Sequence, residues 1–98
     1  MRIRYTPQAR GDIDRIDEYL NKRSSGGARN VLRAIYAGVQ FAAERPEGSK
    51  RTEDPAVRVK VVRRYRYKIF YRILDDAVEV LHIRHTSRRP WKKNADPR

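Results

Sequence analysis

The sequence predicts an α+β domain in which a helical hairpin covers one face of a small antiparallel sheet. The first observation is that apolar residues recur at helical spacing through residues 9–42. The second is that the spacing changes to an alternation of period two within residues 57–83, as expected of half-buried strands. Third, a chain of 98 residues has the usual size of one domain with one core. We therefore expect a single domain over residues 1–91, followed by a basic, flexible tail over residues 92–98.

A short strand and a helix are expected at the N-terminus. Residues 2–5 alternate between charged and apolar side chains, and Thr6 followed by Pro7 is typical of an N-cap and the first helical position. The helix carries an apolar stripe at spacings of four, three and four, formed by Ala9, Ile13, Ile16 and Leu20. The acidic residues of this segment are expected on its other faces, and these are Asp12, Asp14, Asp17 and Glu18.

The second helix follows a break at residues 21–27, where Ser24 or Ser25 is the candidate N-cap. Its apolar residues again recur at helical spacing, and they are Ala28, Val31, Leu32, Ile35, Val39 and Ala42. Pro46 ends the helix, because the residue before a proline disfavours the α conformation. The two helices are expected to lie antiparallel.

A three-stranded antiparallel meander is expected after a loop over residues 46–55. Its strands are residues 57–62, 67–73 and 78–83, with Asp75-Asp76 in the second turn. The odd-numbered apolar residues of the first two strands are expected to point into the core. Four cations would then project together from the face that the helices leave uncovered, namely Arg58, Lys60, Lys68 and Arg72. Because like charges gathered on strands cost stability, this pattern favours a negatively charged ligand over a merely solvated face.

The charge of the chain restricts its partners. The net charge is +12, and residues 56–74 and 82–95 contain no acid. This excess predicts an acidic partner, either nucleic acid or an acidic protein, with a generally basic surface as the alternative. There is no cysteine and there are two histidines, so disulfides are excluded and no metal or cofactor is expected. Without a signal-peptide pattern or eighteen consecutive apolar residues, we expect a cytoplasmic protein with no membrane partner.

Three segments carry a resemblance to a known family. They are YTPQARGDIDRIDEYL near the N-terminus, RVKVVRRYRYKIFYRILDDAVEVLHIRH over residues 58–85, and the TSRRPW that follows. Over residues 3–91 the chain resembles the RelE/ParE superfamily of bacterial toxins from type II toxin–antitoxin modules, which includes plasmid-stabilisation proteins. The resemblance implies a toxin that a cognate antitoxin, encoded beside it, holds inactive in a hetero-oligomer. Such antitoxins typically lay an acidic segment across the toxin, which fits the positive charge.

The superfamily divides into branches with different targets. ParE-like members inhibit DNA gyrase and are not known to be nucleases, whereas RelE-like members cleave messenger RNA in the ribosomal A site. The two well-developed helices and the LHIRH segment, residues 81–85, look closer to ParE-like chains. The resemblance therefore implies a ParE-like toxin that acts on gyrase without enzymatic activity. A basic nucleic-acid-binding module without toxicity is a third reading.

The RelE-like alternative would be a metal-independent endoribonuclease. Attack by the 2′-OH needs a general base, a general acid and cations that stabilise the charged phosphorane. By position, the resemblance assigns the cationic role to Arg58, Lys60, Lys68 and either Arg88 or Arg84. His85 is the candidate general acid or base, with a structural hydrogen bond as its alternative, and His82 is expected to pack or to form a hydrogen bond. Two departures weaken this reading: Lys68 replaces an arginine, and Arg89-Pro90-Trp91 stands in place of a clear catalytic tyrosine.

The same surface would serve a protein target or a phosphate. The candidate target-binding residues are Arg58, Lys60, Lys68, Arg72, Arg84, Arg88, Arg89 and Trp91. Under the ribonuclease alternative, His85 and Arg88 would be catalytic. Trp91 would stack a base or pack the tail onto the domain, whereas Tyr67 and Tyr71 are expected to fill the core.

Overall fold

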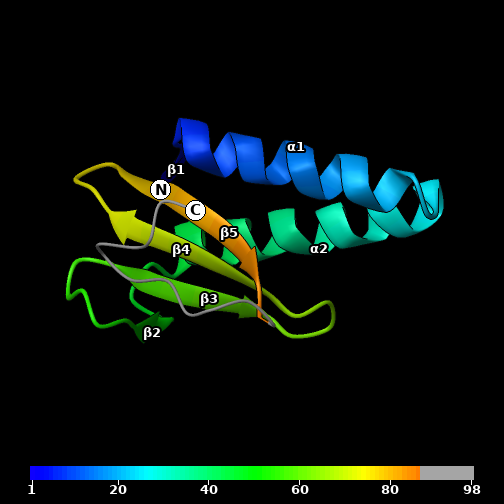
Figure 1. Ribbon diagram of the computed structural model, residues 1–98. Helices are drawn as coiled ribbons and strands as arrows, with labels where there is room; N and C mark the ends of the chain where they lie inside the picture. Colours follow the sequence, from blue (N-terminus) through cyan, green and yellow to red (C-terminus); the bar gives the residue numbers. More distant parts are fainter. Residues whose placement is uncertain (87–98) are drawn as a thin grey trace.

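Two helices and a five-stranded sheet make up residues 1–86, the part of the chain that the computed structural model describes. In chain order the elements are β1 (Arg2–Tyr5), α1 (Pro7–Asn21), α2 (Ser25–Glu44), β2 (Lys50–Arg51), β3 (Arg58–Val62), β4 (Tyr67–Ile73) and β5 (Ala77–His85). The helices run antiparallel and lie on one face of the sheet (Figure 1). The predicted α+β class, with a helical hairpin and a meander, is confirmed.

The sheet has the strand order β1-β5-β4-β3-β2. Strands β3, β4 and β5 form the predicted antiparallel meander. The sequence pattern does not predict two other features of the sheet: β1 pairs with β5 in parallel, and β2 pairs with β3 inside the segment expected as a loop. With two residues, β2 is too short to show an alternation, so only its pairing reveals it.

The helices begin at the predicted capping residues. Thr6 Oγ1 accepts the N–H of Ala9 at 3.1 Å, and Pro7 occupies the first position of α1. Of the two candidates for α2, Ser24 is the N-cap, and its Oγ accepts the N–H of Gly27 at 3.0 Å. Each cap thereby gives a partner to an N–H group that the first turn of a helix leaves unsatisfied.

The core lies between the helices and the sheet face that they cover, which we call the inner face; the opposite face is the open face. Its main cluster joins both helical stripes to inward side chains of β3, β4 and β5, and contains Ala9, Val31, Ile35, Val39, Val62, Tyr67, Ile69, Val80 and Ile83. Tyr71 is fully buried, and its hydroxyl donates to the carbonyl oxygen of Pro46 at 2.6 Å. Tyr67 and Tyr71 therefore fill the core as predicted, and the fully buried phenol keeps a hydrogen-bond partner.

Helix α2 packs closely against the sheet at Gly38. A Cβ atom on this residue would lie 2.9 Å from Cδ1 of Ile69 and 3.1 Å from Cγ2 of Val62. Both distances are shorter than ordinary van der Waals contact, so a side chain here would force Ile69, Val62 or α2 itself to shift. The absence of a side chain at this position therefore sets the spacing between the helix and the sheet.

Candidate functional site

The open face of the sheet combines apolar surface with positive charge. Residues that pair across neighbouring strands share a face, so the register identifies its members. From β3 and β4 these are Val59, Val61, Lys68, Phe70 and Arg72, and from β5 they are Glu79, His82 and Arg84. Lys68 lies opposite Arg84, and the ring of Phe70 stacks on that of His82 with their centroids 6.3 Å apart. Phe70 itself is buried, so the part of this face open to a partner is the half-buried Val59 and Val61 with Lys68 beside them. Apolar side chains with a cation beside them are typical of a surface that docks a partner.

Of the four strand cations expected on this face, two lie there. Lys68 and Arg72 both project from the open side of β4. The Nε of Arg72 donates to Oε1 of Glu79 at 2.7 Å. This ion pair is partly exposed and balances the charge of Arg72 within the protein itself, so Arg72 offers less to a partner than its sequence position suggests.

The expectation that Arg58 and Lys60 project from the open face is wrong. Their partners in β4 are fully buried residues of the inner face, Tyr71 and Ile69. The Nζ of Lys60 lies 4.0 Å from the ring centroid of Phe41 in α2. Arg58 donates from Nη1 to the carbonyl oxygen of Ser49 at 3.0 Å. Lys60 therefore lies against α2, and Arg58 lies against the loop that follows it.

A difference of one residue in the start of β3 explains this error. Val57 is buried as expected, but it belongs to the preceding turn, where its N–H donates to the carbonyl oxygen of Asp54 at 2.9 Å. The strand begins at Arg58, and its inward residues are the even-numbered ones, ending with Val62 opposite Tyr67. Because side chains alternate along a strand, a shift of one residue exchanges the two faces.

The residues of the ribonuclease alternative are divided between the two faces. His85 lies opposite Tyr67 on the inner side of β5, and their rings meet edge to face with centroids 5.2 Å apart. Arg58 and Lys60 lie on that same side, whereas Lys68 projects from the other. General acid–base chemistry needs its groups within hydrogen-bond reach of one substrate. The described residues therefore do not form one catalytic group.

Part of the predicted site falls outside the described residues 1–86. Arg88, Arg89, Trp91, the domain boundary at residue 91 and the tail over residues 92–98 all lie there. Within residues 1–86, no three His, Asp or Glu side chains come together in a way that could hold a metal ion. In the same part of the chain, neither helix has the length and apolar character needed to cross a bilayer.

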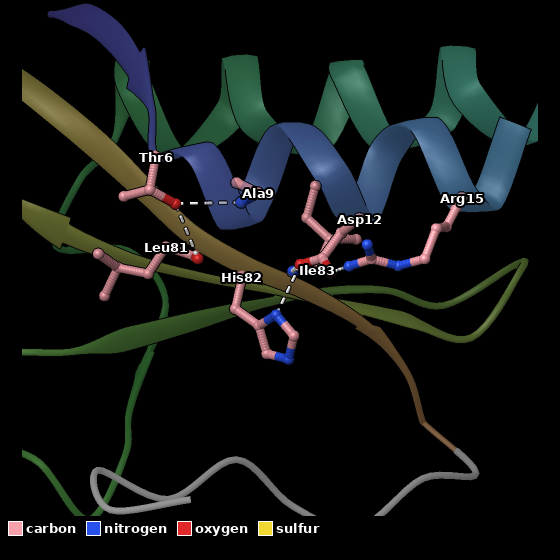
Figure 2. A network of polar contacts seen from close by, with 7 residues as sticks. All are labelled: Thr6, Ala9, Asp12, Arg15, Leu81, His82 and Ile83. Carbon is pink, nitrogen blue, oxygen red and sulfur yellow. Dashed lines mark hydrogen bonds and ion pairs between the residues drawn. The ribbon is translucent and has the colours of Figure 1, made fainter. Parts of the chain in front are cut away.

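The expectation that Asp12 lies on a face of α1 away from the apolar stripe is wrong, because it is the one charged residue that is buried among residues 1–86, with 5% exposure. Its Oδ2 accepts the backbone N–H of Ile83 at 2.9 Å and lies 2.6 Å from Nδ1 of His82 (Figure 2). Its Oδ1 accepts a hydrogen bond from Arg15 at 2.7 Å. Because an ionised carboxylate can only accept, Nδ1 of His82 carries the proton in this contact. The carboxylate therefore fastens α1 to β5 through two donors, from His82 and Ile83, while the third comes from Arg15 of α1 itself.

A signal for this role was present in the sequence. Asp12 follows Ala9 by three residues and precedes Ile16 by four, so it lies on the apolar stripe of α1 and not on a solvated face. A charged residue on such a stripe needs buried partners. The prediction that His82 packs or forms a hydrogen bond is confirmed, and Asp12 is its partner.

A separate hollow lies on the helix side of the molecule. It is lined by Tyr5, Arg10, Ile13, Asp14 and Tyr36, which come from β1, α1 and α2. Burial raises the pKa of Tyr5, and the neighbouring hydroxyl of Tyr36 raises it further. The phenol of Tyr5 therefore stays protonated well beyond neutral pH, and the hollow adds no anionic group besides Asp14.

Comparison with known proteins gives independent findings. The family model described as the ParE toxin of the type II toxin–antitoxin system parDE matches residues 3–90. The solved chromosomal ParDE toxin–antitoxin system from P. aeruginosa is similar, with a TM-score of 0.74 and 22% identity over 87% of this chain and 95% of that chain. The solution structure of a conserved hypothetical protein from Helicobacter pylori has a TM-score of 0.55 and 14% identity over 89% and 96%. No curated protein matches. At these identities the two structures support the fold alone.

Proposed function

This chain belongs to the family of ParE toxins from type II toxin–antitoxin systems, and from that membership we propose that it arrests growth in the cytoplasm by inhibiting DNA gyrase. The observation that carries the proposal is the match of the family model over residues 3–90, almost the whole chain. In this reading the toxin acts by binding and has no catalytic residues. The division of Arg58, Lys60 and His85 from Lys68 supports a binding role over RNA cleavage.

We further propose that a cognate antitoxin with an acidic segment neutralises the toxin by covering the open face. The net charge of +12 supports a partner of opposite sign. On the open face, the half-buried Val59 and Val61 would take apolar side chains of the segment, and Lys68 beside them would take a carboxylate. The gene beside this one is expected to encode a short acidic protein.

Expression of the chain alone in a bacterium tests its target. We expect arrested growth, filamentation, an induced SOS response and relaxed plasmid DNA, with intact transcripts. Co-expression of the acidic neighbour should restore growth. Purified toxin should also inhibit the supercoiling reaction of purified gyrase in a gel assay.

Two results would contradict the gyrase proposal. Rapid, codon-phased cleavage of messenger RNA would assign the chain to the ribonuclease branch in spite of the divided residues. Unaffected growth together with uninhibited gyrase would show that this member of the family does not inhibit gyrase. Plasmid topology and transcript integrity are measured in the same cells, so the two targets are separated in one experiment.

A further inference from the structure

The turn that joins β3 to β4 concentrates arginines. Its four residues are Arg63, Arg64, Tyr65 and Arg66, and the three arginines are exposed while Tyr65 packs against the core. Within residues 1–86, the ion pairs to carboxylates involve other cations and none of these three. The acid-free residues 56–74 flank the turn on both sides. The tip of this hairpin is therefore a positive patch that the described part of the protein does not neutralise.

The backbone of the turn is strained at an arginine. Arg66 has a φ of +62°, and it is the one non-glycine residue with a positive φ in residues 1–86. At the end of such a hairpin turn glycine is the usual residue, because a Cβ atom is unfavourable in the left-handed conformation. A long charged side chain kept in this position, where glycine would fit better, points to a use for the side chain itself.

The turn is also held in place by backbone contacts. The N–H of Arg66 donates to the carbonyl oxygen of Arg63 at 3.3 Å, and the N–H of Thr86 donates to the carbonyl oxygen of Arg66 at 2.7 Å. The guanidinium carbon of Arg64 lies 5.5 Å from the ring centroid of Tyr65. These contacts fix the turn to the end of β5 and orient one guanidinium group before any partner arrives. A pre-ordered cation loses less entropy on binding.

The shape of the tip favours one class of acidic partner. The turn extends past the end of β5 as a protruding loop (Figure 1). An acidic peptide needs apolar anchors and a groove in addition to charge, and the exposed residues of this tip are arginines alone. A duplex presents a regular row of phosphates, which the guanidinium fork binds in bidentate fashion, and its major groove admits a two-stranded β-ribbon.

We propose that the β3–β4 hairpin tip binds the phosphate backbone of duplex DNA through Arg63, Arg64 and Arg66. The contacts are to phosphates, so binding is independent of base sequence and weakens steeply with salt. None of the three residues belongs to the site predicted from the sequence, and all three lie outside the open face assigned to the antitoxin. The proposal does not depend on gyrase being the target, because DNA alone is the probe.

The test measures the affinity of the purified full chain for a fluorescent duplex of mixed sequence by anisotropy, over a series of NaCl concentrations. The tip variant combines Arg63→Gln, Arg64→Gln and Arg66→Asn, the last because asparagine tolerates a positive φ. The plot of log K against log salt has a negative slope, and each lost phosphate contact makes it shallower by about 0.9. We therefore expect the slope of the tip variant to be shallower by about 2.7 than that of the unmodified chain. At about 0.1 M salt its affinity should fall on the order of a hundredfold.

A matched control removes the same charge from the helix layer. It combines Arg29→Gln, Arg33→Gln and Arg45→Gln, three exposed residues of α2 and its C-cap. We expect its salt slope to stay within about one unit of the unmodified chain. Equal losses in both variants would show that net charge alone governs binding, and an unchanged tip variant would remove the tip from the interface; either result overturns the proposal. So would a tip variant that keeps its DNA affinity but loses binding to a poly-glutamate peptide, since that result assigns the tip to an acidic protein.

The single variant Arg66→Gly separates function from folding. Glycine accepts the positive φ, so the melting temperature of the chain should not fall. The DNA affinity should still drop, with a slope smaller by about 0.9. A lower melting temperature with unchanged DNA affinity would show that the side chain serves the fold, and it would overturn the proposal for this residue.

Discussion

Asp12 takes the place of a neighbouring strand for part of β5. Strand β1 ends at Tyr5, opposite Val80, and beyond that point no strand within residues 1–86 pairs with this edge of β5. Thr6 donates from Oγ1 to the carbonyl oxygen of Leu81 at 3.0 Å, and Asp12 accepts the N–H of Ile83 (Figure 2). Side chains at the start of α1 thus satisfy backbone groups that would otherwise be left unpaired at a partly buried edge.

Substitutions of Asp12 should reveal the strength of this contact. Asp12→Ala leaves the buried N–H of Ile83 without an acceptor and removes the partner of His82, so we expect the free energy of unfolding to fall by about 3 kcal/mol. Asp12→Asn keeps one acceptor oxygen and should cost about half as much. Urea denaturation followed by circular dichroism measures both. Losses below about 0.5 kcal/mol in both variants would contradict the role assigned to this carboxylate.

The sequence predicts a residue well where its partner is close along the chain. Thr6 and Ser24 each cap a helix through an N–H group three residues away, and short-range patterns of this kind identify both. Asp12 bonds to residues about seventy positions away in the sequence. A local pattern cannot identify a partner so distant in the sequence, although the position of Asp12 on an apolar stripe indicates that a partner exists.

At the scale of elements, the sequence predicts β4 better than β3. In β4, Tyr67, Ile69 and Tyr71 alternate clearly with their neighbours and are buried as predicted. Ile73, also expected in the core, is exposed, and Phe70 is buried although it lies on the open face. In the segment 57–62 four of the six residues are valines and they occupy both phases, so pattern alone cannot choose the inward set. The pairing of Val62 with Tyr67 places the even-numbered residues of β3 on the inner face. The short strand β2 and the parallel pairing of β1 with β5 likewise depend on tertiary contacts that a local pattern does not contain.

The contact between α2 and the sheet gives a prediction at this scale. Gly38→Ala adds a Cβ atom 2.9 Å from the fully buried Ile69. Alanine favours a helix over glycine by about 1 kcal/mol, but overpacking a core costs about 1–3 kcal/mol, and here we expect overpacking to win. The net loss should be about 1 kcal/mol in the free energy of unfolding, measured by urea denaturation.

Gly26→Ala provides the matched control for this prediction. A Cβ atom on Gly26 would have its nearest neighbour at 4.0 Å, the Oγ of Ser24, so the first turn of α2 has room for it. The same substitution should then stabilise the protein by about 0.5 kcal/mol through helix propensity alone. If both variants were stabilised, Gly38 would not set the spacing between α2 and the sheet.

For the molecule as a whole, charge opposes folding. The net charge is +12, and the ion pairs between residues 1–86 involve three arginines besides the contact of His82: Arg2 with Asp76, Arg15 with Asp12, and Arg72 with Glu79. Most cations therefore repel one another across a small domain, and this repulsion destabilises the compact state. An antitoxin that covers this surface, as proposed above, would explain why it persists in a member of this family.

Salt should consequently stabilise the isolated chain. Raising NaCl from about 0.05 M to about 0.5 M shortens the screening length to a few ångströms and weakens the repulsion between surface cations. We expect an increase in the melting temperature of about 5 °C, equivalent to about 1 kcal/mol for a domain of this size. At low salt an acidic antitoxin segment should raise the melting temperature further than salt does, because it binds the folded state alone.

A melting temperature that stays level or falls as NaCl is raised would show that repulsion between the cations does not destabilise the folded chain. Sodium sulfate at equal ionic strength is the control: a much larger rise in sulfate than in chloride would mean that exclusion of the anion from the protein surface, and not screening, produces the effect.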